Sequence, residues 1–253
     1  MTAISLLRHA IGLLTMQPLK TLTVIGPALA LMIGLSILIA FTAPDILANA
    51  DSSPLGAVPS NWILLVALAL SYSLMAILWH RHTLSGLGTP PPLSATLLLS
   101  YLWRVVLLTG IQISLSLALI VPLLVSSQHS GAEGEAPAFL SVILTTFVTQ
   151  LLLVWLSLRL SLILPAAAIG APIRMVQSWR YTSPVARTLW SIAAILAIFN
   201  TVLTIVVTRF DLTTPIHTLV LELPVYVFEG MLIFSILTTL YARQVHDTPM
   251  NPK

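Results

Sequence analysis

Six long stretches of apolar residues dominate the chain, and shorter polar segments separate them. Because about 20 helical residues cross the hydrocarbon core of a bilayer, each stretch has the length of a membrane span or falls just short of it. The pattern predicts an all-α fold, a polytopic membrane helix bundle with six transmembrane helices. The predicted spans are Thr21–Phe41, Trp62–His80, Val105–Val125, Leu140–Leu158, Leu189–Thr208 and Val225–Tyr241.

The composition leaves no length for a separate domain outside the membrane. Of the 253 residues, 57% are hydrophobic and 8% are charged, with a mean hydropathy of +1.00. A soluble domain usually carries roughly 25% charged residues. Six spans use roughly 120 residues, and the rest is divided among segments too short to bury a core. We therefore predict one integral membrane domain over residues 1–253. The lack of cysteine excludes disulfides, thiolate zinc sites and cysteine nucleophiles.

The charges between the predicted spans sort by sign. Lys and Arg resist translocation and stay on the cytoplasmic side of a membrane, so both termini are predicted to be cytoplasmic. Arg209 is the one basic residue on the opposite side. The basic set is Arg8, Lys20, Arg81, Arg104, Arg159, Arg174, Arg180, Arg187, Arg243 and Lys253; the acidic set is Asp45, Asp51, Glu133, Glu135, Asp211 and Glu222.

The first span is predicted to be retained. Its apolar stretch, Thr21–Phe41, has 21 residues, whereas the apolar core of a signal peptide has roughly 7–15. The residues that follow, Ala40 to Pro44, form a poor cleavage site.

Three segments on the basic side have the pattern of amphipathic helices at the membrane surface. In the first twenty residues an apolar row recurs at three- and four-residue spacing, which places it on one helical face. Alternatively, these segments are the inner ends of long tilted helices. The row is Ile4, Leu7, Ile11 and Leu14, and the other segments are Pro172–Tyr181 and Leu93–Trp103. Ser183-Pro184 reads as the N-cap and first residue of the fifth span.

A threefold repeat of helical hairpins is a further hypothesis. The units would cover residues 1–82, 83–170 and 171–246, each made of a surface helix followed by a hairpin. Gly88-Thr89-Pro90 and Gly170-Ala171-Pro172 occupy corresponding connections. The alternative is that any six-span protein obeying the positive-inside rule has basic residues at these ends.

Arg159 ends a long apolar span and is followed by the apolar segment Leu160–Ala171, interrupted by Pro165. Either the fourth helix continues past Arg159 with a kink, or the segment dips back into the inner leaflet; continuation is favoured. Because an arginine keeps its charge, Arg159 is expected to meet helix-end carbonyls, a lipid phosphate, or hydroxyl and amide groups.

Polar side chains within the spans are candidate functional groups. The set is Gln112, Gln150, Asn200 and Glu229, with Ser71 and Ser73 in the second span. They are read either as interhelical hydrogen-bonding groups or as the lining of a polar pathway. Counting from Val225 places Glu229 roughly 6 Å inside the outer boundary.

The sequence predicts no catalytic residues, no cofactor and no metal site. In His80-Arg81-His82, side chains two residues apart on a helix point in opposing directions, and no cysteine or carboxylate lies nearby in sequence. A basic interfacial cluster is the favoured interpretation. Five arginines are candidate contacts for anionic lipid headgroups: Arg81, Arg159, Arg174, Arg180 and Arg187.

The stretch Arg159-Leu160-Ser161 with Pro165-Ala166, followed by Ser178-Trp179, resembles the YciC-like six-span proteins of the bacterial inner membrane. It is also similar to the membrane domain fused to some glycerophosphodiester phosphodiesterases. Ser183-Pro184 departs from those families, which usually continue with a glycine and a basic or polar pair. The resemblance implies a fold and an inner-membrane location, and it supplies no catalytic residues.

Taken together, these features predict a non-enzymatic accessory or scaffold protein acting on envelope lipids or on a membrane complex. Its expected partners are the bilayer, anionic lipids and another membrane protein, and not nucleic acid. The basic pI of about 9.6 is assigned to the membrane-facing charge. The alternative is a small permease or transporter with a polar pathway at the midplane.

Overall fold

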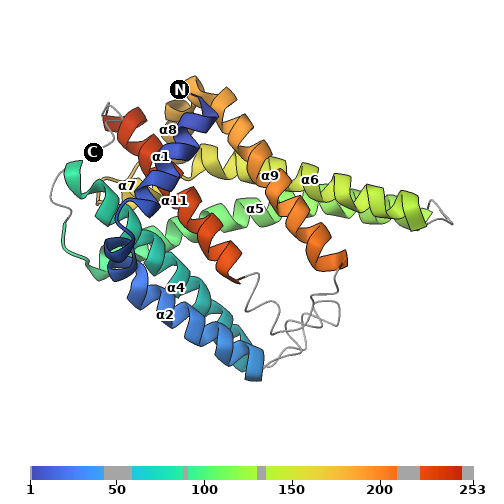
Figure 1. The fold of residues 1–253 in the computed structure, drawn as a ribbon, viewed down its shortest axis with the longest axis horizontal. Helices are drawn as coiled ribbons and strands as arrows, with labels where there is room; N and C mark the ends of the chain where they lie inside the picture. The colour runs from blue at the N-terminus through green and yellow to red at the C-terminus, as the bar shows by residue number, and fades with distance from the viewer. Residues whose placement is uncertain (1, 43–58, 88–90, 130–134, 210–222, 247–253) are drawn as a thin grey trace.

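The computed structural model of the chain describes residues 2–42, 59–87, 91–129, 135–209 and 223–246. Every element assigned in these ranges is helical (Figure 1). The longer helices are α1 (Ala3–Thr15), α2 (Pro18–Thr42), α4 (Pro59–Leu84), α5 (Ala95–His129), α6 (Glu135–Leu160), α9 (Ala186–Arg209) and α11 (Leu223–His246). The short ones are α7 (Ile163–Ala168), α8 (Met175–Thr182) and the 3₁₀ turns η1 (Ser85–Leu87) and η2 (Ser183–Val185).

Six helical segments within the described residues are long and apolar enough to cross a membrane, which confirms the predicted fold class. Their apolar side chains remain largely exposed where the helices do not touch; Ile63, Leu99 and Phe41 are among the most exposed. Contiguous apolar surface on this scale is typical of a protein that lies in lipid. The segments are Pro18–Ile39, Ile63–Leu84, Ala95–Val121, Ile143–Ala168, Met175–Val206 and Leu223–His246. The chain is a multi-pass membrane protein.

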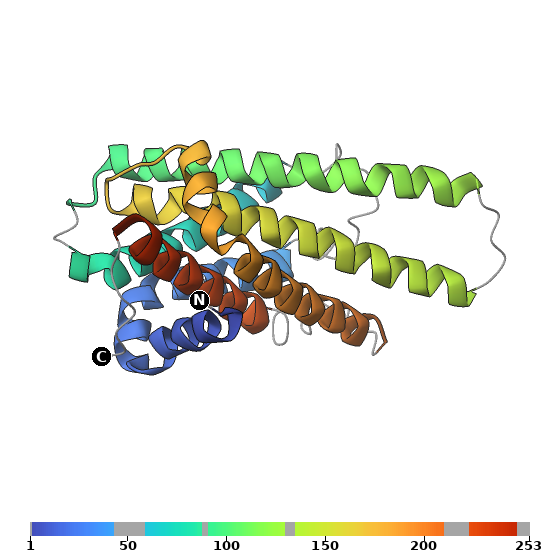
Figure 2. The same cartoon turned by 90° about the horizontal axis from the view of Figure 1, so that it is seen from above.

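Helix α11 lies at the centre of the bundle and packs against α1, α4, α7 and α8 (Figure 1). The other spans pair around it, α2 with α4 and α6 with α9. Helix α5 packs against α6 and α7, and Figure 2 shows α5 and α6 extending together away from the rest of the molecule. The core is therefore concentrated where α7, α8 and α11 meet the ends of the longer helices.

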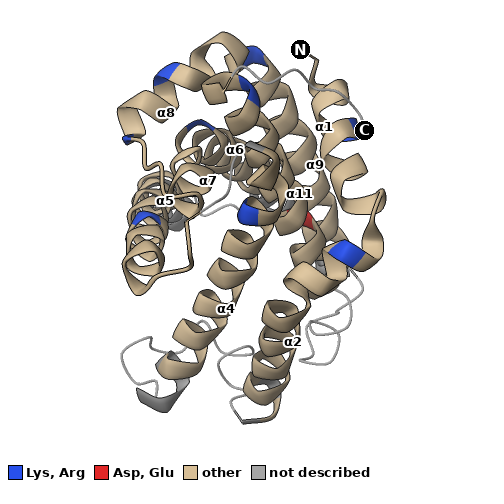
Figure 3. Ribbon diagram, turned by 90° about the vertical axis from the view of Figure 1, so that its left-hand side faces the viewer, with Lys and Arg blue, Asp and Glu red and all other residues tan. Residues whose placement is uncertain are grey.

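The basic residues gather at one end of the bundle. Ten Lys and Arg residues lie in the described ranges. Arg209 ends α9 on the opposite side, and the other nine lie in α1 or α8 or near the helix ends on the same side (Figure 3). The end of α11 lies on this side too, as an even number of spans requires (Figure 1). The loop acids that helped to predict this sorting, Asp45, Asp51, Glu133, Asp211 and Glu222, lie outside the described residues.

Helix α1 has two apolar faces. Leu6 and Ala10 are fully buried against residues of α9 and α11. The row predicted from the spacing lies partly on the outside, where Ile4 and Ile11 are exposed. A helix that is apolar on both its inner and outer faces suits a position against both protein and lipid.

The segment Leu93–Trp103 is not a separate surface helix. From Ala95 it is continuous with α5, a helix of 35 residues, so the alternative interpretation, the inner end of a long helix, is confirmed. The Pro172–Tyr181 segment does contain a short helix of its own, α8, which begins at Met175. Figure 2 shows the chain changing direction between α8 and α9.

The predicted N-cap at Ser183 is wrong. Ser183 has helical backbone angles, and its hydroxyl donates back to the Trp179 carbonyl at 3.0 Å instead of capping the next helix. Pro184 lies in the 3₁₀ turn η2 that joins α8 to α9. The proline lacks an N–H, so the break in hydrogen bonding occurs without leaving a backbone donor unpaired.

The fourth span continues beyond Arg159, as favoured from the sequence. A turn at residues 161–162 separates α6 from α7. Because Pro165 has no N–H to donate, the Ser161 carbonyl accepts from the Leu164 N–H at 3.0 Å instead. All six residues of α7 are buried.

The three predicted hairpins pack differently from one another. Helices α2 and α4 form a closely packed hairpin, whereas α9 packs mainly against α6, and α11 against α1 and α4. Gly170, in the second Gly-x-Pro connection, lies against Pro91, which directly follows the first one. Gly170 has a φ of +78°, and a Cβ there would lie 2.7 Å from Pro91 Cγ; residues 88–90 lie outside the described ranges.

Candidate functional site

Arg159 lies at the end of α6 beneath the junction of α8 and α9. Its side chain is 5% exposed. Nη2 donates to the Trp179 carbonyl at 3.0 Å and to the Ser183 hydroxyl at 3.4 Å. The expectation that Arg159 meets helix-end carbonyls and hydroxyl groups is thus confirmed. Both acceptors are neutral.

Helix α8 buries two hydroxyl side chains against the protein and exposes apolar, polar and charged side chains on its outer side. Ser178 and Thr182 are fully buried, and their hydroxyls donate to the Arg159 carbonyl at 2.7 and 3.4 Å. On the outer side, Val176 is 63% exposed and Trp179 39%. An outer side that carries Val176 and Trp179 together with the exposed Arg180 suits a helix at the interface between lipid and water.

Two tryptophan rings lie against the Arg159 guanidinium. Its Cζ lies 3.9 Å from the centroid of Trp179 and 5.7 Å from that of Trp155, which are cation–π distances. Trp155 also packs edge-on against Trp179 at 5.6 Å and stacks on Trp190 at 4.9 Å. The rings shield the cation from water and leave Trp179 and Trp190 partly exposed.

No carboxylate in the described part of the chain balances Arg159. Two acidic residues lie in the described ranges: Glu135 begins α6, at the end opposite Arg159, and Glu229 accepts a hydrogen bond from Asn200. Two enclosed donors at this site have no partner among the described residues, namely Arg159 Nε and Trp155 Nε1. The site therefore combines an uncompensated positive charge with unused N–H groups.

The other four arginines proposed as headgroup contacts are placed differently. Arg81 is half-buried, and it donates to the Ala168 carbonyl at 3.0 Å and to the Pro91 carbonyl, so it joins α4 to the end of α7. Arg174, Arg180 and Arg187 are exposed at the basic end. The Arg174 backbone N–H donates to the Gln177 side chain at 2.8 Å at the start of α8.

The four polar residues proposed to line a pathway do not converge. Gln112 Nε2 donates to the Ser157 hydroxyl between α5 and α6. Asn200 Nδ2 donates to Glu229 Oε1 at 2.8 Å between α9 and α11. Gln150 has no side-chain partner among the described residues. These are contacts at separate helix interfaces, so the geometry favours interhelical bonding over a shared pathway.

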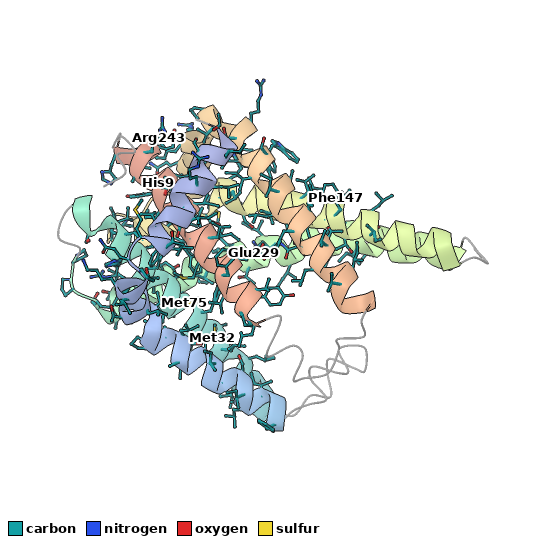
Figure 4. All side chains as sticks on the ribbon, viewed as in Figure 1. His9, Met32, Met75, Phe147, Glu229 and Arg243 are labelled. Atoms are coloured by element: carbon teal, nitrogen blue, oxygen red, sulfur yellow. The ribbon has the colours of Figure 1, made fainter. Side chains whose placement is uncertain are left out.

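Glu229 lies deeper than counting along its helix predicts. Its side chain is 8% exposed, and Figure 4 shows it near the centre of the molecule, with Arg243 at the basic end of the same helix. The neighbouring Gly230 faces Tyr72, which is halfway along α4. A snorkelling position near the outer boundary is therefore not what the structure shows.

A line of hydrogen bonds between α4 and α11 was not identified from the sequence. Trp79 Nε1 donates to the Ser235 hydroxyl at 3.1 Å, and His80 Nδ1 lies 2.8 Å from the Thr238 hydroxyl. The Thr238 proton is used on the Phe234 carbonyl, so the imidazole is the donor. His80 is fully buried and does not belong to an interfacial cluster, whereas His82 is exposed. The hydroxyl side chains on one face of α11 could have indicated this interface from the sequence, since such groups form hydrogen bonds between membrane helices.

The chain was compared with protein-family models, curated proteins and solved structures, and none matches.

Proposed function

We propose that the chain is a non-enzymatic, multi-pass accessory or scaffold protein of the bacterial inner membrane, with both termini in the cytoplasm. Its basic end lies in the cytoplasmic leaflet and associates there with anionic phospholipids and with a membrane-protein partner. The resemblance to YciC-like proteins supports the choice of membrane.

One observation carries the proposal: of the Lys and Arg residues in the described ranges, all but Arg209 lie at one end of a largely apolar bundle. Basic residues near the surface of an anionic leaflet contribute about 1 kcal/mol each to membrane association. Their retention on the cytoplasmic side also sets the orientation of a multi-pass protein. One arrangement therefore accounts for both orientation and lipid preference.

Reporter fusions test the orientation. A periplasmic enzyme fused after Ser127 is expected to be active, and the same enzyme fused after Gly88 is expected to be silent, because Gly88 belongs to a connection on the basic side. Activity at Gly88 with silence at Ser127 would overturn the topology.

Charge neutralisation tests the lipid and partner association. We expect the triple substitution of Arg174, Arg180 and Arg187 by Gln to reduce co-purification of anionic lipid or of a partner protein. Two single substitutions on one helix form a matched pair, since Arg187 and Arg209 lie at opposite ends of α9. Arg187→Gln changes the basic end, and Arg209→Gln is its control. If the triple variant keeps both associations, the proposal fails.

A further inference from the structure

Arg159 provides a built cationic site at the basic end, where the proposed function places anionic lipid. We propose that Arg159, with Arg187 and the tryptophans around it, binds the phosphate group of one anionic phospholipid. This inference rests on the proposed function for the position of the basic end in the cytoplasmic leaflet. It names one binding site and one class of ligand, whereas the proposed function involves the whole basic end.

The first argument is the uncompensated charge. Arg159 is 5% exposed and remains protonated in any protein environment. Its two described acceptors are a backbone carbonyl and a hydroxyl, and its only other partners are aromatic faces. A cation held by neutral groups in a low-dielectric environment attracts an anion strongly.

The second argument is the donor that remains available. A guanidinium carries five N–H groups, and the described hydrogen bonds of Arg159 all come from Nη2. Nε is enclosed, so Nη1 is the nitrogen left to donate. A phosphate oxygen is a suitable acceptor, because arginine forms short, charge-assisted hydrogen bonds with phosphate.

The third argument is a second cation on the same side. Arg187 follows Ser183 by four residues and precedes Trp190 by three, so in a helix it shares their face. Ser183 contacts Arg159, and Trp190 stacks on Trp155 over the same site. Arg187 is exposed, so its charge is available to an anion at this end of the bundle.

The rim of the site favours a lipid over a soluble anion. Trp179 and Trp190 are each 39% exposed, and Val176 is 63% exposed. An apolar rim with exposed tryptophans matches the level where lipid headgroups meet acyl chains. A phospholipid can place its phosphate on Arg159 and its chains along this rim, whereas inorganic phosphate gains nothing from it.

Thermal unfolding of the full-length chain in a neutral detergent tests the site. Three additives are compared at equal concentrations: short-chain phosphatidylglycerol, short-chain phosphatidylcholine and inorganic phosphate. We expect phosphatidylglycerol to raise Tm most. Its apparent affinity is expected to fall about tenfold in Arg159→Gln, which removes the charge-assisted bond, and less in Arg187→Gln. Arg209→Gln, at the opposite end of α9 from Arg187, is the matched control and should bind normally.

If Arg159→Gln does not fold, the variants Arg159→Lys and Arg187→Gln test the proposal in its place. Lys retains the charge but loses the planar fork, so it should bind more weakly than Arg. An equal effect of inorganic phosphate would assign the site to a soluble anion and overturn the lipid assignment, as would an equal effect of phosphatidylcholine. If the Arg159 and Arg187 variants bind phosphatidylglycerol normally while the triple Gln variant loses lipid, the proposed site is wrong but the proposed function stands. If the wild type binds no anionic lipid, the proposed function fails with it.

Discussion

Helices α11 and α5 have similar apolar character but different roles. In the most apolar stretch of each helix, 61% of the residues of α11 are buried, against 6% of those of α5. Small and hydroxyl residues on α11, Gly230, Ser235 and Thr238 among them, face neighbouring helices. On α5 the exposed positions carry large side chains such as Ile113 and Leu117.

The difference shows what decides burial in a membrane protein. Lipid tails are as apolar as leucine, so no hydrophobic driving force pulls one span against another. Close approach at small residues and interhelical hydrogen bonds make the difference instead. Hydropathy therefore predicts that both helices cross the membrane and says little about which one forms the core.

The largest expected contrast comes from removing matched isoleucines. Ile236 on α11 is fully buried, and Ile113 on α5 is 55% exposed. Ile236→Ala should cost about 3 kcal/mol by leaving a cavity, whereas Ile113→Ala should cost less than about 0.5 kcal/mol. The free energies of unfolding can be compared by SDS titration in detergent micelles. Equal losses would show that α5 is packed as tightly as α11.

The second contrast uses two helical glycines. A Cβ at Gly230 would lie 2.1 Å from the Tyr72 hydroxyl oxygen, whereas at Gly110 on α5 it would meet nothing within 4 Å. Gly230→Ala should destabilise the protein by about 2 kcal/mol through overpacking. Gly110→Ala should be neutral or stabilise it by up to about 1 kcal/mol. Adding Tyr72→Phe, which removes the nearest atom, should recover part of the Gly230→Ala loss in the same titration.

The third contrast concerns hydroxyl groups. Thr238→Val removes the acceptor of His80 Nδ1 between α4 and α11, and a loss of about 1 kcal/mol is expected. Ser114 on α5 donates only to the Gly110 carbonyl of its own helix, at 2.8 Å, so Ser114→Ala should change stability little. A double-mutant cycle of His80→Ala with Thr238→Val measures the coupling. A coupling near zero would remove this bond from the explanation for the central position of α11.

The smallest expected effect tests the one described side-chain bond from α5 to another helix. Gln112→Leu breaks its bond to Ser157 on α6 and should cost about 0.6 kcal/mol, the typical value for such bonds in membranes. Gln150→Leu is the control, since Gln150 has no described partner. A larger loss in Gln150→Leu would show that the distinction drawn between the two amides is wrong.

The sequence predicts the spans well because lipid imposes a length and a composition on each helix independently. It also identifies Arg159, since a charge between two apolar segments stands out without any knowledge of contacts. The partners of Arg159 could not be predicted, because Trp179 lies in the short helix α8 and Ser183 in the turn after it, 20 and 24 residues further along the chain.

The errors have a common physical origin. Leu93–Trp103 and Ser183 were interpreted from local patterns, but a helix can run past the interface, and a serine hydroxyl can bond back to its own helix. His80 next to Arg81 suggested an exposed basic cluster; the structure turns the two side chains to different partners, Thr238 and Ala168. Residues that are adjacent in the sequence can have different surroundings in the structure.

The central position of α11 has a consequence for biosynthesis. Trp79 and His80 find their partners 156 and 158 residues later in the chain. At roughly 5–20 residues per second, that separation corresponds to a delay on the order of 10–30 s. During this time the spans that precede α11 lack the helix that joins them. Chains truncated after α9 would leave the Trp79 and His80 donors unpaired in the bilayer, and the cell's membrane quality control would encounter them in that state.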